Sequence, residues 1–113
     1  MAEITEVKTK NAPAPLPVFS QAIKANGFVF LSGNIGMDKD TWKLVDGGIK
    51  AQTEQALNNI KAILEASGSG LNRIVKLNIY IRKFEDFAPL NEVYDKFFGT
   101  PKPARTCVAV FDL

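Results

Sequence analysis

One segment restricts the fold of this chain more than any other. Residues Ile74 to Arg82 alternate between apolar and polar side chains along their whole length. The apolar set, expected on one face of a β-strand, is Val75, Leu77, Ile79 and Ile81. Because a strand with one apolar face is stable only when that face is covered, the rest of the chain must supply a covering layer.

Two segments with helical periodicity can form that layer. The first runs from Ile49 to Ser67 and is followed by Gly68, a residue typical of helix ends. The second runs from Glu85 to Phe98 and is followed by Gly99. The first helix places its apolar stripe at Ile49, Ala56, Leu57, Ile60, Ile63 and Leu64. The second helix spaces Phe87, Leu90, Tyr94 and Phe97 for one apolar face. The phenylalanines expected in the core near it are Phe84, Phe87, Phe97 and Phe98.

Further strands are predicted at Ile4–Lys8, at Phe28–Leu31 after Asn26-Gly27, and at Ala104–Phe111. The prolines at 13, 15 and 17 forbid a helix between the first two strands and favour an extended loop. The resulting order is β-β-α-β-α-β. We therefore expect one α+β domain over residues 1–113, in two layers, with both helices packed on one face of a sheet.

Composition excludes several classes of function. The chain has 113 residues and no histidine, which removes Ser–His–Asp catalysis and the usual zinc sites. Its 14 basic and 12 acidic residues give a net charge of +2, too small by itself to indicate nucleic-acid binding. A single cysteine, no long apolar run and no secretory signal favour a cytoplasmic location, with the mitochondrial matrix as the alternative.

Arg105 is the first candidate for a functional residue. It opens the last predicted strand, where its neighbours on the same face are Cys107, Ala109 and Phe111. A guanidinium on an otherwise apolar face needs a partner, and its planar fork suits a carboxylate or a phosphate. On the residues alone, a structural salt bridge or an arginine whose head reaches solvent explains the position equally well.

Three further positions carry weaker signals. Asn91 follows Phe87 by four residues and so shares the apolar face of the second helix, where its amide must find partners. Ser32 and Gly33 end a strand and can offer backbone donors to a ligand. Cys107 lies near the charge of Arg105, which favours its thiolate. Ordinary burial or an ordinary strand end remains an alternative for each.

Together these segments resemble the Rid family of reactive-intermediate deaminases, also called YjgF or L-PSP endoribonuclease-like proteins. The resemblance runs from about Pro13 to Val110. Its most specific mark is Pro103-Ala104-Arg105-Thr106 after a proline-rich approach. The other segments that carry it are Phe19-Ser20-Gln21-Ala22, Phe30-Leu31-Ser32-Gly33-Asn34-Ile35, Ala51-Gln52-Thr53-Glu54-Gln55-Ala56-Leu57, Val75-Lys76, and Asp86-Phe87 through Asn91-Glu92-Val93-Tyr94.

The resemblance implies a chorismate-mutase-like fold that forms a trimeric barrel, a homotrimer with ligand clefts between subunits. It also implies hydrolysis of 2-imino acids, such as 2-iminobutanoate or 2-iminopropanoate, to 2-keto acids and ammonia without cofactor or metal. By position, Arg105 would bind the substrate carboxylate and Cys107 would contact the imine. The residues implied to line the cleft are Phe19, Ser32, Gly33, Phe87 and Asn91.

The sequence departs from the family pattern at two important places. Phe19 stands where the family usually has tyrosine, which removes a hydroxyl from the cleft. The sequence ends at Phe111-Asp112-Leu113, whereas family members continue into a final strand with an acidic, alternating pattern. A glutamate in that strand is thought to help the attacking water, and no residue here can replace it. We therefore hypothesise that this is a shortened form, or a variant isoform, of a longer parent.

Three functions follow as hypotheses. The first is the 2-imino acid deaminase. The second is a non-catalytic trimer that binds small acids or partner proteins, which Phe19 and the absent glutamate favour. The third is an endoribonuclease or translation inhibitor, as some relatives are described, which the charge of +2 and the lack of histidine make the weakest.

Overall fold

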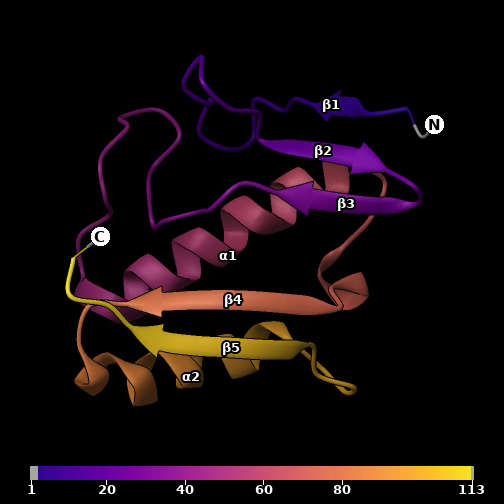
Figure 1. Ribbon diagram of the computed structural model, residues 1–113. Helices are drawn as coiled ribbons and strands as arrows, with labels where there is room; N and C mark the ends of the chain where they lie inside the picture. The colour runs from indigo at the N-terminus through magenta and orange to yellow at the C-terminus, as the bar shows by residue number, and fades with distance from the viewer. Residues whose placement is uncertain (1–2, 113) are drawn as a thin grey trace.

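The computed structural model describes residues 3–112, so the predicted features at Met1, Ala2 and Leu113 lie outside the described residues. Figure 1 shows the arrangement of the elements. In chain order these are β1 (Thr5–Val7), β2 (Ala22–Ala25), β3 (Phe28–Leu31), α1 (Gly48–Ala66), η1 (Leu71–Arg73), β4 (Lys76–Ile81), η2 (Phe84–Asp86), α2 (Phe87–Phe97) and β5 (Ala104–Ala109).

Both predicted helices and all four predicted strands are present, with ends shifted by a few residues. The structure adds β2, which the sequence pattern did not predict because alanine and lysine are poor strand formers. β2 pairs with β3 across a two-residue turn, in which Asn26 and Gly27 have φ values of 52° and 79°. Two successive residues with positive φ are typical of tight β-hairpins. The dipeptide Asn26-Gly27 was therefore the sequence feature from which a strand before it, β2, could have been predicted.

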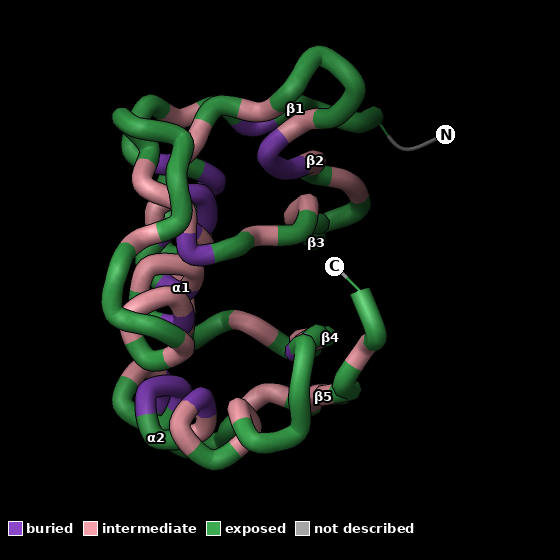
Figure 2. Tube along the Cα trace, turned by 90° about the vertical axis from the view of Figure 1, so that its left-hand side faces the viewer, coloured by how far each residue is buried: buried purple, intermediate pink, exposed green. Residues whose placement is uncertain are grey.

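The strands form two sheets rather than the single expected sheet. β1, β2 and β3 form an antiparallel sheet, and β4 pairs in parallel with β5. Within residues 3–112 no hydrogen-bonded ladder joins β3 to β4. Figure 2 shows that α1 and α2 lie together on one side of the strands, so the α+β design with its helices on one face is confirmed.

Two apolar clusters hold the layers together. The larger lies between α1, α2 and β4 and consists of Leu57, Ile81, Leu90, Tyr94 and Phe98. The smaller lies under the three-stranded sheet and consists of Val7, Ala12, Ala22 and Ile63. The large apolar side chains of each cluster contribute about 1.5–3 kcal/mol each when fully buried.

The expectation that Phe84 belongs to the core is wrong. It lies in η2, before α2 begins, and 73% of it is exposed. Its ring stacks on Phe87 with centroids 5.6 Å apart. The helical face that turns aromatic residues inward therefore starts only at Phe87, while Phe98 at the other end is buried as expected.

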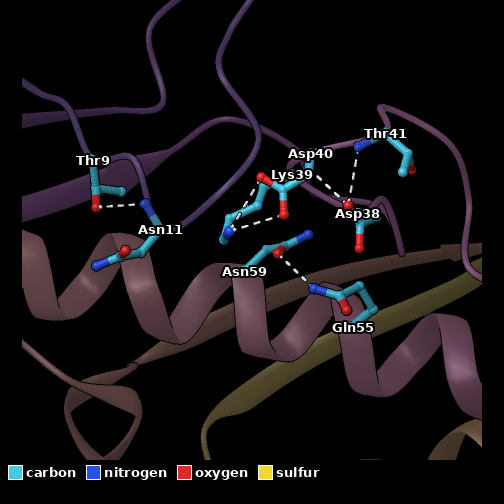
Figure 3. A network of polar contacts seen from close by, with 8 residues as sticks. All are labelled: Thr9, Asn11, Asp38, Lys39, Asp40, Thr41, Gln55 and Asn59. Atoms are coloured by element: carbon cyan, nitrogen blue, oxygen red, sulfur yellow. Dashed lines mark hydrogen bonds and ion pairs between the residues drawn. The ribbon is translucent and has the colours of Figure 1, made fainter.

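Asn59 attaches the long loop after β3 to α1. It is 2% exposed, and its amide nitrogen donates to the carbonyl oxygens of Ile35 and Met37, 3.3 and 2.9 Å away. Its Oδ1 accepts from Gln55 at 2.9 Å, as Figure 3 shows. Since the loop starts at the end of β3, Asn59 also fixes the path of the chain beyond Ser32.

The side chain of Gln21 anchors the proline-rich loop between β1 and β2 by hydrogen bonds. Its Oε1 accepts from the backbone N–H of Thr9, while its Nε2 donates to the carbonyl oxygens of Thr9 and Pro13. The side chain is buried, so these bonds replace the water that the groups would otherwise bind. The loop that carries Phe19 is therefore anchored at its start and next to its end.

We expect Asn59→Leu to lower the free energy of unfolding by about 1–3 kcal/mol, because it removes a buried amide that donates to the loop carbonyl groups of Ile35 and Met37. Urea unfolding followed by circular dichroism measures the change. Asn58→Leu on the exposed side of α1 is the matched control and should change stability by less than about 0.5 kcal/mol. Equal effects of both substitutions would contradict the role assigned to Asn59.

Candidate active site

Arg105 lies on β5, beside Leu77 of β4, and faces α2. Its guanidinium carbon is 4.8 Å from the ring centre of Tyr94 and 5.5 Å from that of Phe87. Both distances are within the range in which a cation is attracted by the face of an aromatic ring. Two side chains of α2 thus hold the half-buried guanidinium in place.

The charges around Arg105 leave its own charge unpaired. Asp95, the acidic residue of the adjoining pocket, forms an ion pair with Lys102 at 2.7 Å. Lys102 also donates to the carbonyl oxygen of Phe98 at 2.7 Å, which holds it at the end of α2. No ion pair to Arg105 occurs within the described part of the chain. With Asp95 neutralised by Lys102, the pocket keeps one positive charge and suits an anion.

Two buried polar atoms next to this charge have no hydrogen-bond partner. They are Oδ1 of Asn91 and the hydroxyl of Tyr94. Asn91, Tyr94 and Arg105 line one pocket of about 360 Å³. Since buried polar atoms in native proteins are almost always paired, these two indicate a site that is completed by a ligand, by water or by another chain.

Tyr94 is the functional candidate that the sequence analysis missed, because its spacing assigned it to the core face of the helix. It lies three residues after Asn91 and therefore on the same side of α2. Burial raises the pKa of Tyr94, and the nearby charge of Arg105 only partly opposes this. The hydroxyl is consequently protonated at neutral pH and is available as a donor.

The structure divides the predicted site residues into two groups. Phe87, Asn91 and Arg105 gather at the pocket beside α2. Ser32 and Gly33 line a different cavity, between β3 and β4, which shares no described residue with the first. The hydroxyl of Ser32 donates to the carbonyl oxygen of Ser20 at 2.6 Å, so it is already used within the chain.

Phe19 and Gly33 are both exposed, and a side chain added at Gly33 would meet no atom within 4 Å. Ser20 lies between Phe19 and the Gln21 anchor, and it connects this loop to the end of β3 through Ser32. Phe19, Ser32 and Gly33 therefore belong to one surface region, separate from Arg105.

Cys107 lies two residues after Arg105 on the same face of β5, beside Ile79 of β4. It is half-buried and packs against the larger apolar cluster. It does not line the pocket of Arg105. A contact between its side chain and a ligand held by Arg105 would need a ligand that extends along the strand.

The described residues also limit other kinds of site. Among residues 3–112 no three cysteine or acidic side chains are placed to hold a metal ion together. In the same part of the chain, neither helix combines the length and the apolar character that crossing a bilayer requires.

We expect Tyr94 to titrate above its ordinary pKa of 10.0, because its buried hydroxyl resists ionisation. The chain has two tyrosines, so the difference between the absorbance titrations of the parent and of Tyr94→Phe isolates the signal of Tyr94. Since the folded pKa is raised, the stability from neutral Tyr94 is full below pH 10 and is lost as pH rises through the folded value. A midpoint at or below 10 would contradict this environment for Tyr94.

Comparison with known proteins places these features in a family. The family model described as Endoribonuclease L-PSP matches residues 9–113. A RutC family protein of Pyrococcus horikoshii is 52% identical over 102 residues, which cover 90% of this chain and 81% of the relative. A protein of Dermatophagoides farinae named 2-iminobutanoate/2-iminopropanoate deaminase is 44% identical over 107 residues, which cover 95% of this chain and 84% of the relative.

The fold agrees with solved structures. RidA from the Antarctic bacterium Psychrobacter sp. PAMC 21119 superposes with a TM-score of 0.92 at 44% identity, over 96% of this chain and 88% of that one. The fold class and the resemblance drawn from Pro103-Ala104-Arg105-Thr106 and the other segments are thereby confirmed. This chain belongs to the Endoribonuclease L-PSP family, the family of the RidA and RutC proteins.

Proposed function

We propose that the chain is one subunit of a homotrimeric deaminase that hydrolyses 2-imino acids, such as 2-iminobutanoate or 2-iminopropanoate, to 2-keto acids and ammonia. The observation that carries the proposal is the unpaired guanidinium of Arg105, stacked on Tyr94 beside two buried polar atoms without partners. The relative named as a deaminase for this pair of substrates supports the choice of chemistry.

In the proposed reaction Arg105 binds the substrate carboxylate through its two-pronged fork. Phe87 forms one wall of the cleft, Asn91 contacts the substrate nearer to the imine, and Cys107, whose side chain lies outside the pocket, contributes a backbone contact. Water attacks the carbon of the C=N bond and forms a carbinolamine, whose C–N bond then breaks and releases ammonia. Because an imine is already reactive, positioning the substrate supplies most of the acceleration.

The open side of the sheets supports the homotrimer. The helices cover one side of the strands. Phe28, Phe30 and Tyr80 are 57%, 60% and 58% exposed. They alternate along β3 and β4 with more buried residues, so they face the side away from the helices. Contiguous apolar side chains on a protein surface usually mark an interface. In a trimer that buries this side, Phe19, Ser32 and Gly33 of one subunit are proposed to complete the cleft that contains Arg105 of its neighbour.

A non-catalytic trimer that binds small carboxylic acids is the second candidate. The acidic residue that lines the pocket of Arg105 is Asp95, which Lys102 already neutralises, so the described pocket offers no free base for water. Phe19 brings no hydroxyl to the cleft. An endoribonuclease is weaker, because it would have to work without histidine and with a net charge of +2. The proposed location is the cytoplasm, with the mitochondrial matrix as the alternative.

We expect Arg105→Ala to reduce keto-acid release at least tenfold, because about 1.5–3 kcal/mol of charged hydrogen bonding to the carboxylate is lost. The imine is generated in situ by an amino-acid oxidase, and keto acid is followed with and without a trapping amine. Arg82→Ala removes an exposed arginine and is the matched control. No acceleration by the parent chain, together with acid binding that depends on Arg105, would favour the non-catalytic candidate.

A site shared between subunits predicts complementation. Gly33→Trp should fill the proposed cleft without a clash inside its own chain, and Arg105→Ala should remove the carboxylate clamp. After co-refolding of the two inactive variants in equal amounts, about a quarter of parent activity should return, because each half of an interface is intact in about half of the subunits. No recovery in verified mixed trimers would place the whole site within one chain.

A further inference from the structure

Phe84 is an exposed aromatic residue that neither the core nor the proposed site explains. It lies in η2, between β4 and α2, and 73% of it is exposed. A single apolar side chain on a protein surface is common and needs no explanation by itself. Phe84 differs because its ring is stacked on Phe87, and Phe87 in turn contacts the guanidinium of Arg105.

The backbone of η2 holds the two rings parallel. The N–H of Phe87 donates to the carbonyl oxygen of Phe84, which is the bond between residues three apart that defines a 3₁₀ turn. In such a turn, side chains three residues apart lie directly above one another, whereas in an α-helix they are displaced around the axis. The ring planes accordingly differ by only 6°, with centroids 5.6 Å apart. The stack is therefore a property of the turn and is present without a ligand.

Phe84 and Phe87 form one end of a longer row of flat groups. The guanidinium of Arg105 lies 5.5 Å from the ring centre of Phe87 and 4.8 Å from that of Tyr94. These two rings are about 11 Å apart along α2, so the guanidinium lies between them. Tyr94 then packs on Phe98. The order along the row is Phe84, Phe87, Arg105, Tyr94, Phe98.

One end of this row is closed and the other is open. Tyr94 and Phe98 are each 6% exposed and belong to the larger apolar cluster, so the core closes that end. Phe87 is half-buried and Phe84 is mostly exposed, so their end is open to solvent. A side chain of an acid bound at Arg105 therefore finds free ring surface only at the end formed by Phe87 and Phe84.

The charges beside Arg105 direct an apolar group to the same end. The Asp95–Lys102 ion pair lines the pocket of Arg105. Apolar atoms that covered this pair would remove water from two charges and offer no hydrogen bond in return. The rings of Phe87 and Phe84 have no polar group to desolvate, and offset or tilted aromatic rings attract one another. The favourable place for an apolar side chain is thus the ring pair.

We propose that Phe84 and Phe87 form an aromatic subsite, the Phe84–Phe87 platform, which selects ligands of Arg105 that have a long apolar or aromatic side chain. The inference rests on the proposed deaminase function for the reaction and adds its substrate class. The 2-imino acids derived from phenylalanine or leucine are preferred to those with side chains of one or two carbons. A side chain that short ends beside Phe87 and gains nothing from the exposed ring of Phe84.

Turnover of two imines tests the preference. An amino-acid oxidase supplies the imine of phenylalanine or that of alanine, and kcat/KM for keto-acid release is measured for each. In Phe84→Ala the ratio of the first constant to the second should fall about fivefold or more, because a ring contact is lost. Phe84→Tyr keeps the ring and should keep the ratio. Ile4→Ala removes an exposed apolar side chain before β1 and is the matched control. An unchanged ratio in Phe84→Ala would overturn the proposal.

Binding of unreactive acids separates the platform from the proposed reaction. Isothermal titration calorimetry compares 3-phenylpropanoate with propanoate, which share the carboxylate and differ in the ring. The phenyl acid should bind the parent about fivefold or more tightly, lose this advantage in Phe84→Ala and lose binding in Arg105→Ala. If the phenyl acid is preferred but no imine is turned over, the deaminase proposal fails and the platform stands. If imines are turned over but the phenyl acid is not preferred, the platform is wrong and the deaminase stands.

The alternative occupant of the exposed ring is a second copy of the chain. Size-exclusion chromatography with light scattering gives the mass of the parent and of Phe84→Ala at equal concentrations. Equal masses, with the preference for the phenyl acid lost in the variant, would support a ligand subsite. A lower mass for Phe84→Ala would assign the ring to a contact between subunits and would overturn the proposal.

Discussion

The stacking of Arg105 on Tyr94 is the contact through which the core and the candidate site depend on each other. Tyr94 is 6% exposed and packs against Phe98, with ring centres 4.6 Å apart, inside the cluster that joins α1, α2 and β4. The guanidinium of Arg105 lies over one face of the Tyr94 ring. Any loosening of the cluster would shift the ring and with it the charge, so the position of Arg105 is set by apolar packing rather than by an ion pair.

The pairing of Asp95 with Lys102 completes this arrangement. If Asp95 paired with Arg105 instead, the guanidinium would be neutralised and the pocket would have no reason to bind an anion. Lys102 is held by Asp95 and by the carbonyl oxygen of Phe98, at the end of α2 where cations are favoured. The ion pair is exposed and adds little stability; its effect is to leave the charge of Arg105 available.

Three remaining features are those on which the proposed homotrimer rests. Three of the seven candidate site residues gather around Arg105, three lie at the end of β3 and in the loop anchored by Gln21, and Cys107 lies on β5 outside both groups. One side of the sheets exposes aromatic side chains, and residues of β3 and β4 line a cavity between the two sheets. A small domain buries a limited share of its surface, so contacts with other chains are a common source of additional stability.

The sequence by itself determined the helices and most of the strands, and it singled out Arg105 as a candidate. These conclusions rest on local patterns: the alternation at 74–82, the apolar stripe at 49–67, and a guanidinium placed on an apolar strand. Local patterns also explain the errors. Phe84 is as apolar as Phe98, but it lies in η2, before α2 begins, and is therefore not on the helical face that packs into the core.

Only the tertiary structure decided which residues meet. Tyr94 was assigned to the core because spacing cannot show that β5 brings Arg105 over its ring. The separation of Ser32 and Gly33 from Arg105 depends on how two sheets lie beside one helix layer. The cavity between β3 and β4 depends on the same arrangement. Strand propensity and periodicity are properties of neighbours along the chain, whereas sheet order and side-chain partners are set by contacts between distant segments, which a single sequence does not encode in any local pattern.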